Sequence, residues 1–335
     1  MNEEDLSIIF HEFYEKKVKD EDIKNLVILW REKGETPHEL KRLAHILNIK
    51  QGQKDIFSDT VDVCGTGGDK SNTFNVSTLA AIIASSCGAK VIKHSGRSTT
   101  SISGSVNILS QFEINTDGTG ELKENCFRKT NLMFVSSNLL RETFGEVKKI
   151  CKEINLPGFV NLLGPLTNPY KTTYHILGVS NLEWGKLLSS TLKLLNKNKE
   201  VLVVCSEVKK NKSIILDELS FCGSNYLWHL VNREIYEESF VPSDFGIKTV
   251  GLNELVINDI KESKDVFEKI LRGELTQNDP KVGIVALNAG AVLYLTKMVK
   301  TLADGYDFAL QHIQSGKSWE HLQNFINCNK KNNVY

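Results

Sequence analysis

The chain has 335 residues, of which 41% are hydrophobic and 24% are charged, a composition that excludes a disordered or fibrous protein and is typical of a soluble globular one. Its 41 basic and 41 acidic residues give a formal net charge of zero, so no overall field favours a nucleic-acid partner. The length predicts two domains or one enlarged α/β domain.

Cysteine usage and the first residues bear on the compartment. The seven cysteines are scattered, without a Cys-x-x-Cys pair or a neighbouring histidine cluster, which indicates reduced thiols and neither disulfides nor a zinc site. The chain starts with acidic residues where a secretory signal would be basic, and it has no apolar run long enough for a membrane helix. We therefore expect a cytoplasmic protein without a membrane partner.

The first 50 residues predict helices only, because their apolar positions recur at helical spacing. Gly34 is suited to end one helix, and Thr36 followed by Pro37 is suited to start the next. A compact helical unit is the expected outcome.

From residue 60 onward, short apolar runs alternate with helical segments, which is the pattern of an α/β fold. Strands are predicted at 61–64, 89–93, 131–135, 201–205 and 214–216. Helices are predicted at 77–87, 103–112, 139–154, 181–195, 282–299 and 304–315.

The strongest motif is a glycine-rich loop, Gly65-Thr66-Gly67-Gly68-Asp69, between a predicted strand and a predicted helix that opens at Ser77 and Thr78. Glycine lets the backbone approach an anion, and the hydroxyl and free N–H groups at a helix start donate hydrogen bonds to phosphate oxygens. The loop fits neither the Walker nor the Rossmann pattern. It predicts a phosphate site, with a plain tight turn as the alternative.

A second loop follows the next predicted strand, with the sequence Lys93-His94-Ser95-Gly96-Arg97-Ser98-Thr99-Thr100-Ser101. Its cations and hydroxyl groups suit a diphosphate that must be bound and then released. Two such loops at the same end of adjacent strands would face one ligand. A solvated Ser/Thr-rich loop is the alternative.

An acidic pair, Asp217 and Glu218, ends a β-like run. Magnesium prefers carboxylates together with substrate phosphates, so adjacent acids at a strand end can hold this ion. Taken alone, such a pair is more often ordinary surface charge.

These motifs, together with Asn161-Leu162-Leu163-Gly164-Pro165-Leu166-Thr167-Asn168-Pro169, resemble the anthranilate phosphoribosyltransferases, and similar strings extend over nearly the whole chain. The resemblance implies Mg²⁺-dependent transfer of the phosphoribosyl group from 5-phosphoribosyl-1-pyrophosphate (PRPP) to anthranilate, with release of pyrophosphate, a step of tryptophan biosynthesis. It also implies a small helical domain at 1–56, joined by helices from about 165–195, and a large α/β domain at 57–164 and 196–335. The large domain would have a mixed, mostly parallel sheet flanked by helices, and the family usually forms a homodimer through the small domains.

The resemblance also assigns the site residue by residue. Donor contacts would come from Gly65, Gly68, Asp69, Thr73, Asn75, Val76, Ser77, Thr78, Lys93, His94, Ser95, Gly96, Arg97, Ser98, Thr99, Thr100, Ser101 and Ser105. Acceptor contacts would come from Gly65, Gly96, Arg141, Cys151, Gly164 and Pro165. Ser77 would ligate one magnesium ion, and Asp217 with Glu218 would ligate a second. No dedicated general base is expected, because the aryl amine is already neutral and positioned charges stabilise the departing pyrophosphate.

The acceptor side departs from the family's pattern. The family's basic loop reads Lys-His-Gly-Asn-Arg, whereas this chain has Ser95-Gly96 at its centre and lacks the amide. Counting back from Gly164 without gaps places Arg141 where the family has a His, and Cys151 where it has an Arg that meets the aromatic acid. We hypothesise that Arg141 binds the carboxylate; Lys152 could also restore this contact, and Arg141 could instead be an ordinary surface residue.

Three other functions remain open at this point. The changes at positions 96, 141 and 151 would also suit a relative that uses another amine acceptor. Nucleoside phosphorylases share the fold and carry a Lys-x-Ser-Gly-Arg string, but they lack the Asn-Leu-Leu-Gly-Pro-Leu segment. A non-catalytic binding protein, including a branch that associates with nucleic acid, is disfavoured by the zero net charge and by the intact acidic pair.

Overall fold

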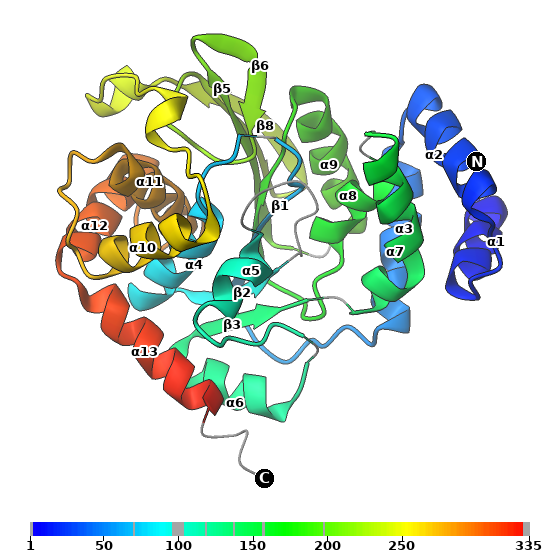
Figure 1. Cartoon of the computed structure of the whole chain (residues 1–335), viewed down its shortest axis with the longest axis horizontal. Coiled ribbons are helices and arrows are strands. Elements are labelled where there is room, and N and C mark those ends of the chain that lie inside the picture. Colours follow the sequence, from blue (N-terminus) through cyan, green and yellow to red (C-terminus); the bar gives the residue numbers. More distant parts are fainter. Residues whose placement is uncertain are drawn as a thin grey trace.

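The computed structural model describes residues 3–69, 71–95, 104–117, 119–136, 138–155, 158–196 and 198–330. An eight-stranded sheet runs through the middle of the molecule, with helices on both sides (Figure 1). Its strands are β1 (Thr60–Gly65), β2 (Lys90–His94), β3 (Leu132–Val135), β4 (Tyr174–Gly178), β5 (Glu200–Val208), β6 (Asn211–Leu216), β7 (Asn225–Val231) and β8 (Glu234–Phe240).

The strand order is β3-β2-β1-β4-β5-β7-β8, and β6 pairs with β5 outside this path. The strands β1 to β5 run parallel to one another, whereas antiparallel ladders join β6 and β7 to β5, and β8 to β7. Every residue of β4 is buried, as expected where helices cover both faces of a parallel sheet. The predicted mixed, mostly parallel sheet is confirmed.

One face of the sheet packs against helices from both halves of the chain, on the left of Figure 1. These helices are α4 (Val76–Ser86), α5 (Ser105–Ser110), α10 (Ile260–Leu271), α11 (Pro280–Leu295), α12 (Leu302–Gln314) and α13 (Lys317–Lys330), with α6 (Glu121–Thr130) beside α13. Nearly all of α11 is buried, which explains why its sequence is apolar on every side.

On the other side, one apolar cluster joins the sheet to a group of helices, of which α9 contacts β5 and β7 directly. These helices are α1 (Glu3–Tyr14), α2 (Asp20–Lys33), α3 (Pro37–Lys50), α7 (Asn138–Glu153), α8 (Phe159–Leu163) and α9 (Leu182–Leu195). As predicted, Gly34 ends α2, with φ +81°. Thr36 begins α3 with a capping box that includes Glu39, an arrangement that satisfies two backbone N–H groups. Besides α9, the N-terminal helices also contact α7 and α8.

Short 3-10 helices occupy three of the connections: η1 (Gly164–Leu166), η2 (Pro242–Phe245) and η3 (Leu252–Glu254). The sequence analysis did not predict β4, β7, β8, α6, α8, α10 or α13. Among the described residues, none of the helices combines the length and apolar composition needed to cross a membrane.

Candidate functional site

The first predicted phosphate loop follows β1, and the second follows the adjacent parallel strand β2, so both begin at the same edge of the sheet. Gly68 adopts φ +88°, a conformation that L side chains rarely take. A Cβ at Gly65 would lie 2.6 Å from Asp217 Oδ2, so glycine allows the loop to approach the acidic pair.

The acidic pair, Asp217 and Glu218, directly follows β6 and reaches both the first loop and the start of α4. The Gly67 N–H donates a hydrogen bond to Asp217 Oδ2 at 2.9 Å, and the Ser77 N–H donates one to Glu218 Oε1 at 3.0 Å. Sequence analysis expected the free N–H groups of this helix start to point at phosphate, but Glu218 accepts the hydrogen bond from one of them.

Charge is crowded at this point. Burial raises the pKa of Asp217 to about 7, and the nearby charge of Asp69 adds to the effect. Burial also raises the pKa of Glu218 well above its ordinary value, as does the charge of Asp217. Because crowded carboxylates favour a bound cation and oxygen donors suit magnesium, the acidic pair and the hydroxyl of Ser77 fit this ion.

Lys93 is fully buried at the end of β2. Its ammonium donates to the Val63 carbonyl at 2.6 Å and to Ser77 Oγ at 3.2 Å. Burial lowers the pKa of Lys93, while the neighbouring acids act in the opposite direction. The lysine therefore orients Ser77 and adds positive charge beside the acidic pair.

Asn288, on α11, is a positioning residue that sequence analysis did not single out. It accepts a hydrogen bond from the Leu219 N–H at 3.1 Å and donates one to the Leu219 carbonyl at 2.8 Å. These two contacts fix the backbone directly after the acidic pair. Asn288 lies in Leu287-Asn288-Ala289-Gly290-Ala291, one of the further strings in which the sequence resembles the family, and this resemblance was the available signal.

A cavity of about 570 Å³ brings most of the predicted residues together. The predicted residues that line it are Gly65, Gly68, Asp69, Thr73, Asn75, Ser77, Lys93, His94, Ser95, Ser105, Arg141, Gly164, Pro165, Asp217 and Glu218. Within the described part of the chain, three predicted residues are buried outside its lining: Val76, Thr78 and Cys151. The predicted residues Gly96, Arg97, Ser98, Thr99, Thr100 and Ser101 lie outside the described residues.

The wall contributed by α7 is basic. It includes Arg141, Lys148, Lys149 and Lys152, and α7 has non-helical backbone angles at Phe144, between Arg141 and these lysines. Arg141 Nη1 lies 3.6 Å from Asp117 Oδ1, and the Arg141 side chain is 48% exposed. Burial lowers the pKa of Lys148, so this ammonium is less solvated than an ordinary surface lysine.

Sequence analysis missed Lys148. Its spacing of four residues from Lys152 places both side chains on one helix face, which was the available signal. Cys151 points elsewhere: a Cβ at Gly158 would lie 2.6 Å from its Sγ, and the cysteine belongs to the apolar cluster of the helical side. The position that aligned with the family's Arg thus contributes nothing to the cavity wall.

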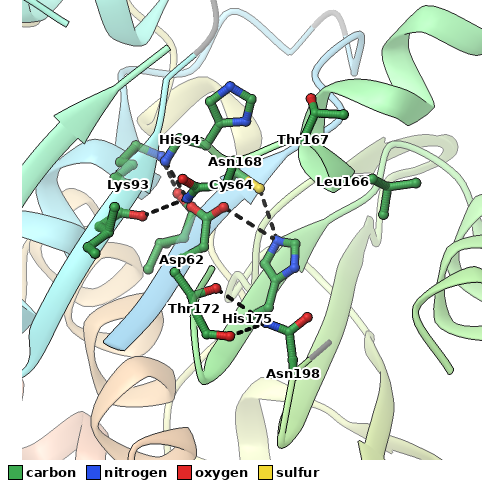
Figure 2. A network of polar contacts seen from close by, with 12 residues as sticks. Asp62, Cys64, Lys93, His94, Leu166, Thr167, Asn168, Thr172, His175 and Asn198 are labelled. Atoms are coloured by element: carbon green, nitrogen blue, oxygen red, sulfur yellow. Dashed lines mark hydrogen bonds and ion pairs between the residues drawn. The ribbon is translucent and has the colours of Figure 1, made fainter. Parts of the chain in front are cut away.

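A buried polar network lies beside this cavity (Figure 2). The His94 N–H donates to Asp62 Oδ1 at 2.8 Å, and Cys64 Sγ lies 3.1 Å from His175 Nε2. Burial raises the pKa of the Cys64 thiol well above its usual range, with Asp62 adding to the effect, and burial lowers the pKa of His175. Asn168 continues the network by donating to the Ile92 carbonyl at 3.1 Å.

Comparisons with known proteins agree with this architecture. Residues 58–319 match the model of the glycosyl transferase family, a/b domain. An anthranilate phosphoribosyltransferase of Bacillus pumilus is 31% identical, covering 100% of this chain and 96% of that protein. One from Chromobacterium violaceum is 36% identical over 81% of this chain and 76% of that protein.

Solved structures give the same picture. Anthranilate phosphoribosyltransferase from Thermus thermophilus is 25% identical, with a TM-score of 0.83 over 98% of this chain and 96% of that one. The enzyme from Saccharomyces cerevisiae in complex with PRPP and Mg is also 25% identical, with a TM-score of 0.81 over 97% of this chain and 92% of that one.

Proposed function

The chain belongs to the glycosyl transferase family that includes the anthranilate phosphoribosyltransferases, and from this premise we propose that it transfers the phosphoribosyl group of PRPP to anthranilate. The observation that carries the proposal is the cavity in which the glycine-rich loop, Lys93 to Ser95 at the end of β2, the acidic pair and a basic helix wall meet. Such an enzyme is a pentosyltransferase that releases pyrophosphate in tryptophan biosynthesis, and the match over the whole chain disfavours both a phosphorylase and a non-catalytic binding protein.

The reaction displaces pyrophosphate from the anomeric carbon of the ribose by the amine of anthranilate. When bound, magnesium supplies positive charge to the departing diphosphate. The glycine-rich loop and Ser77 hold the donor phosphates. Asp217 fixes the loop by accepting a hydrogen bond from the Gly67 N–H, and Lys93 fixes Ser77 by donating one to its Oγ. Because the aryl amine attacks as a neutral group, the protein contributes mainly by orienting the two substrates and stabilising the charge on the departing pyrophosphate.

For the acceptor carboxylate we propose Lys148 as the main cationic partner, with Arg141 in a supporting role. Both residues line the cavity on α7, but Arg141 is half exposed, whereas burial lowers the pKa of Lys148. A solvated charge contributes little, whereas a desolvated ammonium interacts more strongly. This assignment gives the acceptor carboxylate a cationic partner even though Cys151, at the position of the family's Arg, is buried in the apolar cluster of the helical side.

The proposal is tested by mixing the purified chain with Mg²⁺, PRPP and anthranilate, and following the loss of anthranilate fluorescence together with the release of pyrophosphate. We expect both signals in equal amounts, and neither without Mg²⁺. Pyrophosphate release only with a different amine would instead support the second candidate, a paralogue with another acceptor, which the altered acceptor wall favours. No release with any amine would contradict both.

We further propose that two magnesium ions bind in each active site. Ser77 and the acidic pair both line the cavity, and the Ser77 N–H contacts Glu218. This arrangement supports two ions that share the diphosphate, one near the Ser77 hydroxyl and one at Asp217 and Glu218. Titration with Mn²⁺ in the presence of PRPP, followed by electron paramagnetic resonance, should count two ions per chain in the wild type and one in Asp217→Asn.

We also propose a homodimer joined through the small helical domain. The sequence predicts 1–56 and helices from about 165–195 for this domain, with 57–164 and 196–335 forming the large one; because α7 and α8 pack against the N-terminal helices, we assign these two helices to the small domain as well. The helical region exposes apolar side chains: Ile8 is 58% exposed, Leu29 62% and Ile49 65%. Such residues on adjacent helices support an interface. Light scattering should give a dimer for the wild type and a monomer for a Leu29→Lys, Ile49→Lys variant.

Cytoplasmic residence is supported by the seven free cysteines.

A further inference from the structure

Three potential metal ligands meet in the polar network beside the cavity: Asp62 and Cys64 on β1, and His175 on β4 (Figure 2). The register pairs Asp62 directly with His175, and Cys64 lies two residues further along β1. Because side chains alternate along a strand, all three project from the same face of the sheet. Their ligand atoms lie within 4.8 Å of one another, and all three residues are buried.

The separations suit a small ion. Cys64 Sγ lies 3.1 Å from His175 Nε2, and this nitrogen lies 4.0 Å from Asp62 Oδ2. With zinc bonds of about 2.0–2.3 Å, neighbouring ligand atoms of a tetrahedral site lie about 3.3–3.6 Å apart. These two separations fall on either side of the ideal values, and the separation of Cys64 from Asp62 is at most 4.8 Å, so side-chain adjustments would be needed to complete the geometry.

The hydrogen bonding of the Asp62 carboxylate also supports a bound cation. Its Oδ1 accepts a hydrogen bond from the His94 N–H, but its Oδ2 is buried without a hydrogen-bond partner among the described residues. The carboxylate is 1% exposed, and an unsatisfied buried carboxylate oxygen is costly. Lys93 does not fill this position, because its ammonium contacts Val63 and Ser77.

The donor set differs in kind from that of the acidic pair. Magnesium binds oxygen ligands, whereas a thiolate, an imidazole and a carboxylate together suit zinc. A small cavity of about 30 Å³, whose lining includes Asp62, His175 and Asn198, adjoins two of the three ligands. This space can hold one water molecule as a fourth ligand.

We propose that Asp62, Cys64 and His175 bind one zinc-class divalent cation, separate from the magnesium ions of the donor site. The ion links β1 to β4 directly below the loop that starts at Gly65, and so restrains the base of the donor site. No zinc site was predicted from the sequence, because the cysteines are scattered and no histidine cluster lies beside them. Cys64 and His175 are 111 positions apart, and the β1–β4 ladder brings them together.

The test uses the purified full chain after chelator treatment, titrated with Co²⁺ and then with Zn²⁺. Cobalt should produce a thiolate charge-transfer absorption band, zinc should abolish it, and the stoichiometry should be about one ion per chain. Cys64→Ser should remove the band, and His175→Asn should weaken zinc binding by more than the roughly 10–100-fold that loss of an outer partner costs. Zinc should also raise the thermal midpoint of the wild type but not that of either variant.

Two controls separate this site from other ligands. Cys205→Ser removes another buried strand thiol and should leave the cobalt band unchanged, and Asp217→Asn alters the donor site and should also leave it unchanged. A wild-type chain without the band, or a Cys64→Ser variant that binds zinc as the wild type does, would overturn the proposal. If Cys64→Ser does not fold, the wild-type spectrum and His175→Asn give the same decision. None of these readouts depends on transferase activity.

Discussion

The two ends of the cavity are built in different ways. The described part of the donor end consists of strand ends and the first loop, which buried contacts of Asp217, Lys93 and Glu218 hold in place. The acceptor end is made largely of α7, whose basic side chains are more exposed and whose backbone departs from helical geometry at Phe144. We expect phosphate and metal binding to leave little freedom for substitution in the donor end, whereas side chains on a helix surface can change and still bind a carboxylate.

The largest effect should come from breaking the donor end. Asp217→Asn removes a carboxylate next to the first loop, so turnover should fall by about 10²–10³-fold because charge on the departing pyrophosphate is no longer balanced. Steady-state kinetics at saturating Mg²⁺ would measure this loss. Asp265→Asn, on the exposed side of α10 and paired with Lys269, is the matched control and should retain full activity.

A smaller effect is expected at the acceptor end. Lys148→Met keeps much of the side-chain volume but removes the charge, so the Michaelis constant for anthranilate should rise by about 10–100-fold, while that for PRPP stays constant. Lys148→Arg should recover most of the loss. Equal changes in both Michaelis constants would show that Lys148 supports the fold of the cavity and does not bind the acceptor.

The pH dependence separates the two ends further. Because the pKa of Asp217 is raised to about 7, this carboxyl takes up a proton as the pH falls through that value, and the proton competes with magnesium. The Mg²⁺ concentration for half-maximal activity should therefore rise by about tenfold per pH unit below pH 7. A magnesium requirement that is the same at pH 6 and pH 8 would contradict the assignment of this pair.

The smallest effect is expected for Arg141. Its guanidinium is half exposed and lies near Asp117, so Arg141→Ala should raise the Michaelis constant for anthranilate by only about two- to fivefold. A larger rise than that of Lys148→Met would restore Arg141 as the main partner of the carboxylate. An unchanged constant would make Arg141 an ordinary surface residue.

Local motifs could be predicted from the sequence, whereas contacts across the fold could not. The glycines and hydroxyls around Gly65 and Ser77 are local in sequence and flank a strand and a helix, so the motif determines their arrangement. Asn288 contacts Leu219, which lies 69 positions earlier in the chain, and His175 contacts Cys64, which lies 111 positions earlier. Neither role can be derived from spacing along the chain.

The missed elements have similar explanations. The strand β4 is only five residues long and carries a buried histidine at its second position, so it shows neither alternation nor a continuous apolar run. The strand β8 is largely polar and pairs only with β7 at the edge of the sheet. By contrast, α10 begins at a clear Asp259 cap, a signal that the sequence analysis did not use.

The most direct test of the account is calorimetry of PRPP binding with and without Mg²⁺. We expect one PRPP site per wild-type chain, with binding that requires Mg²⁺ and weakens strongly in Asp217→Asn. The absence of any binding, or an affinity that neither Mg²⁺ nor Asp217→Asn changes, would contradict the claim that the two loops and the acidic pair hold one metal-bound diphosphate.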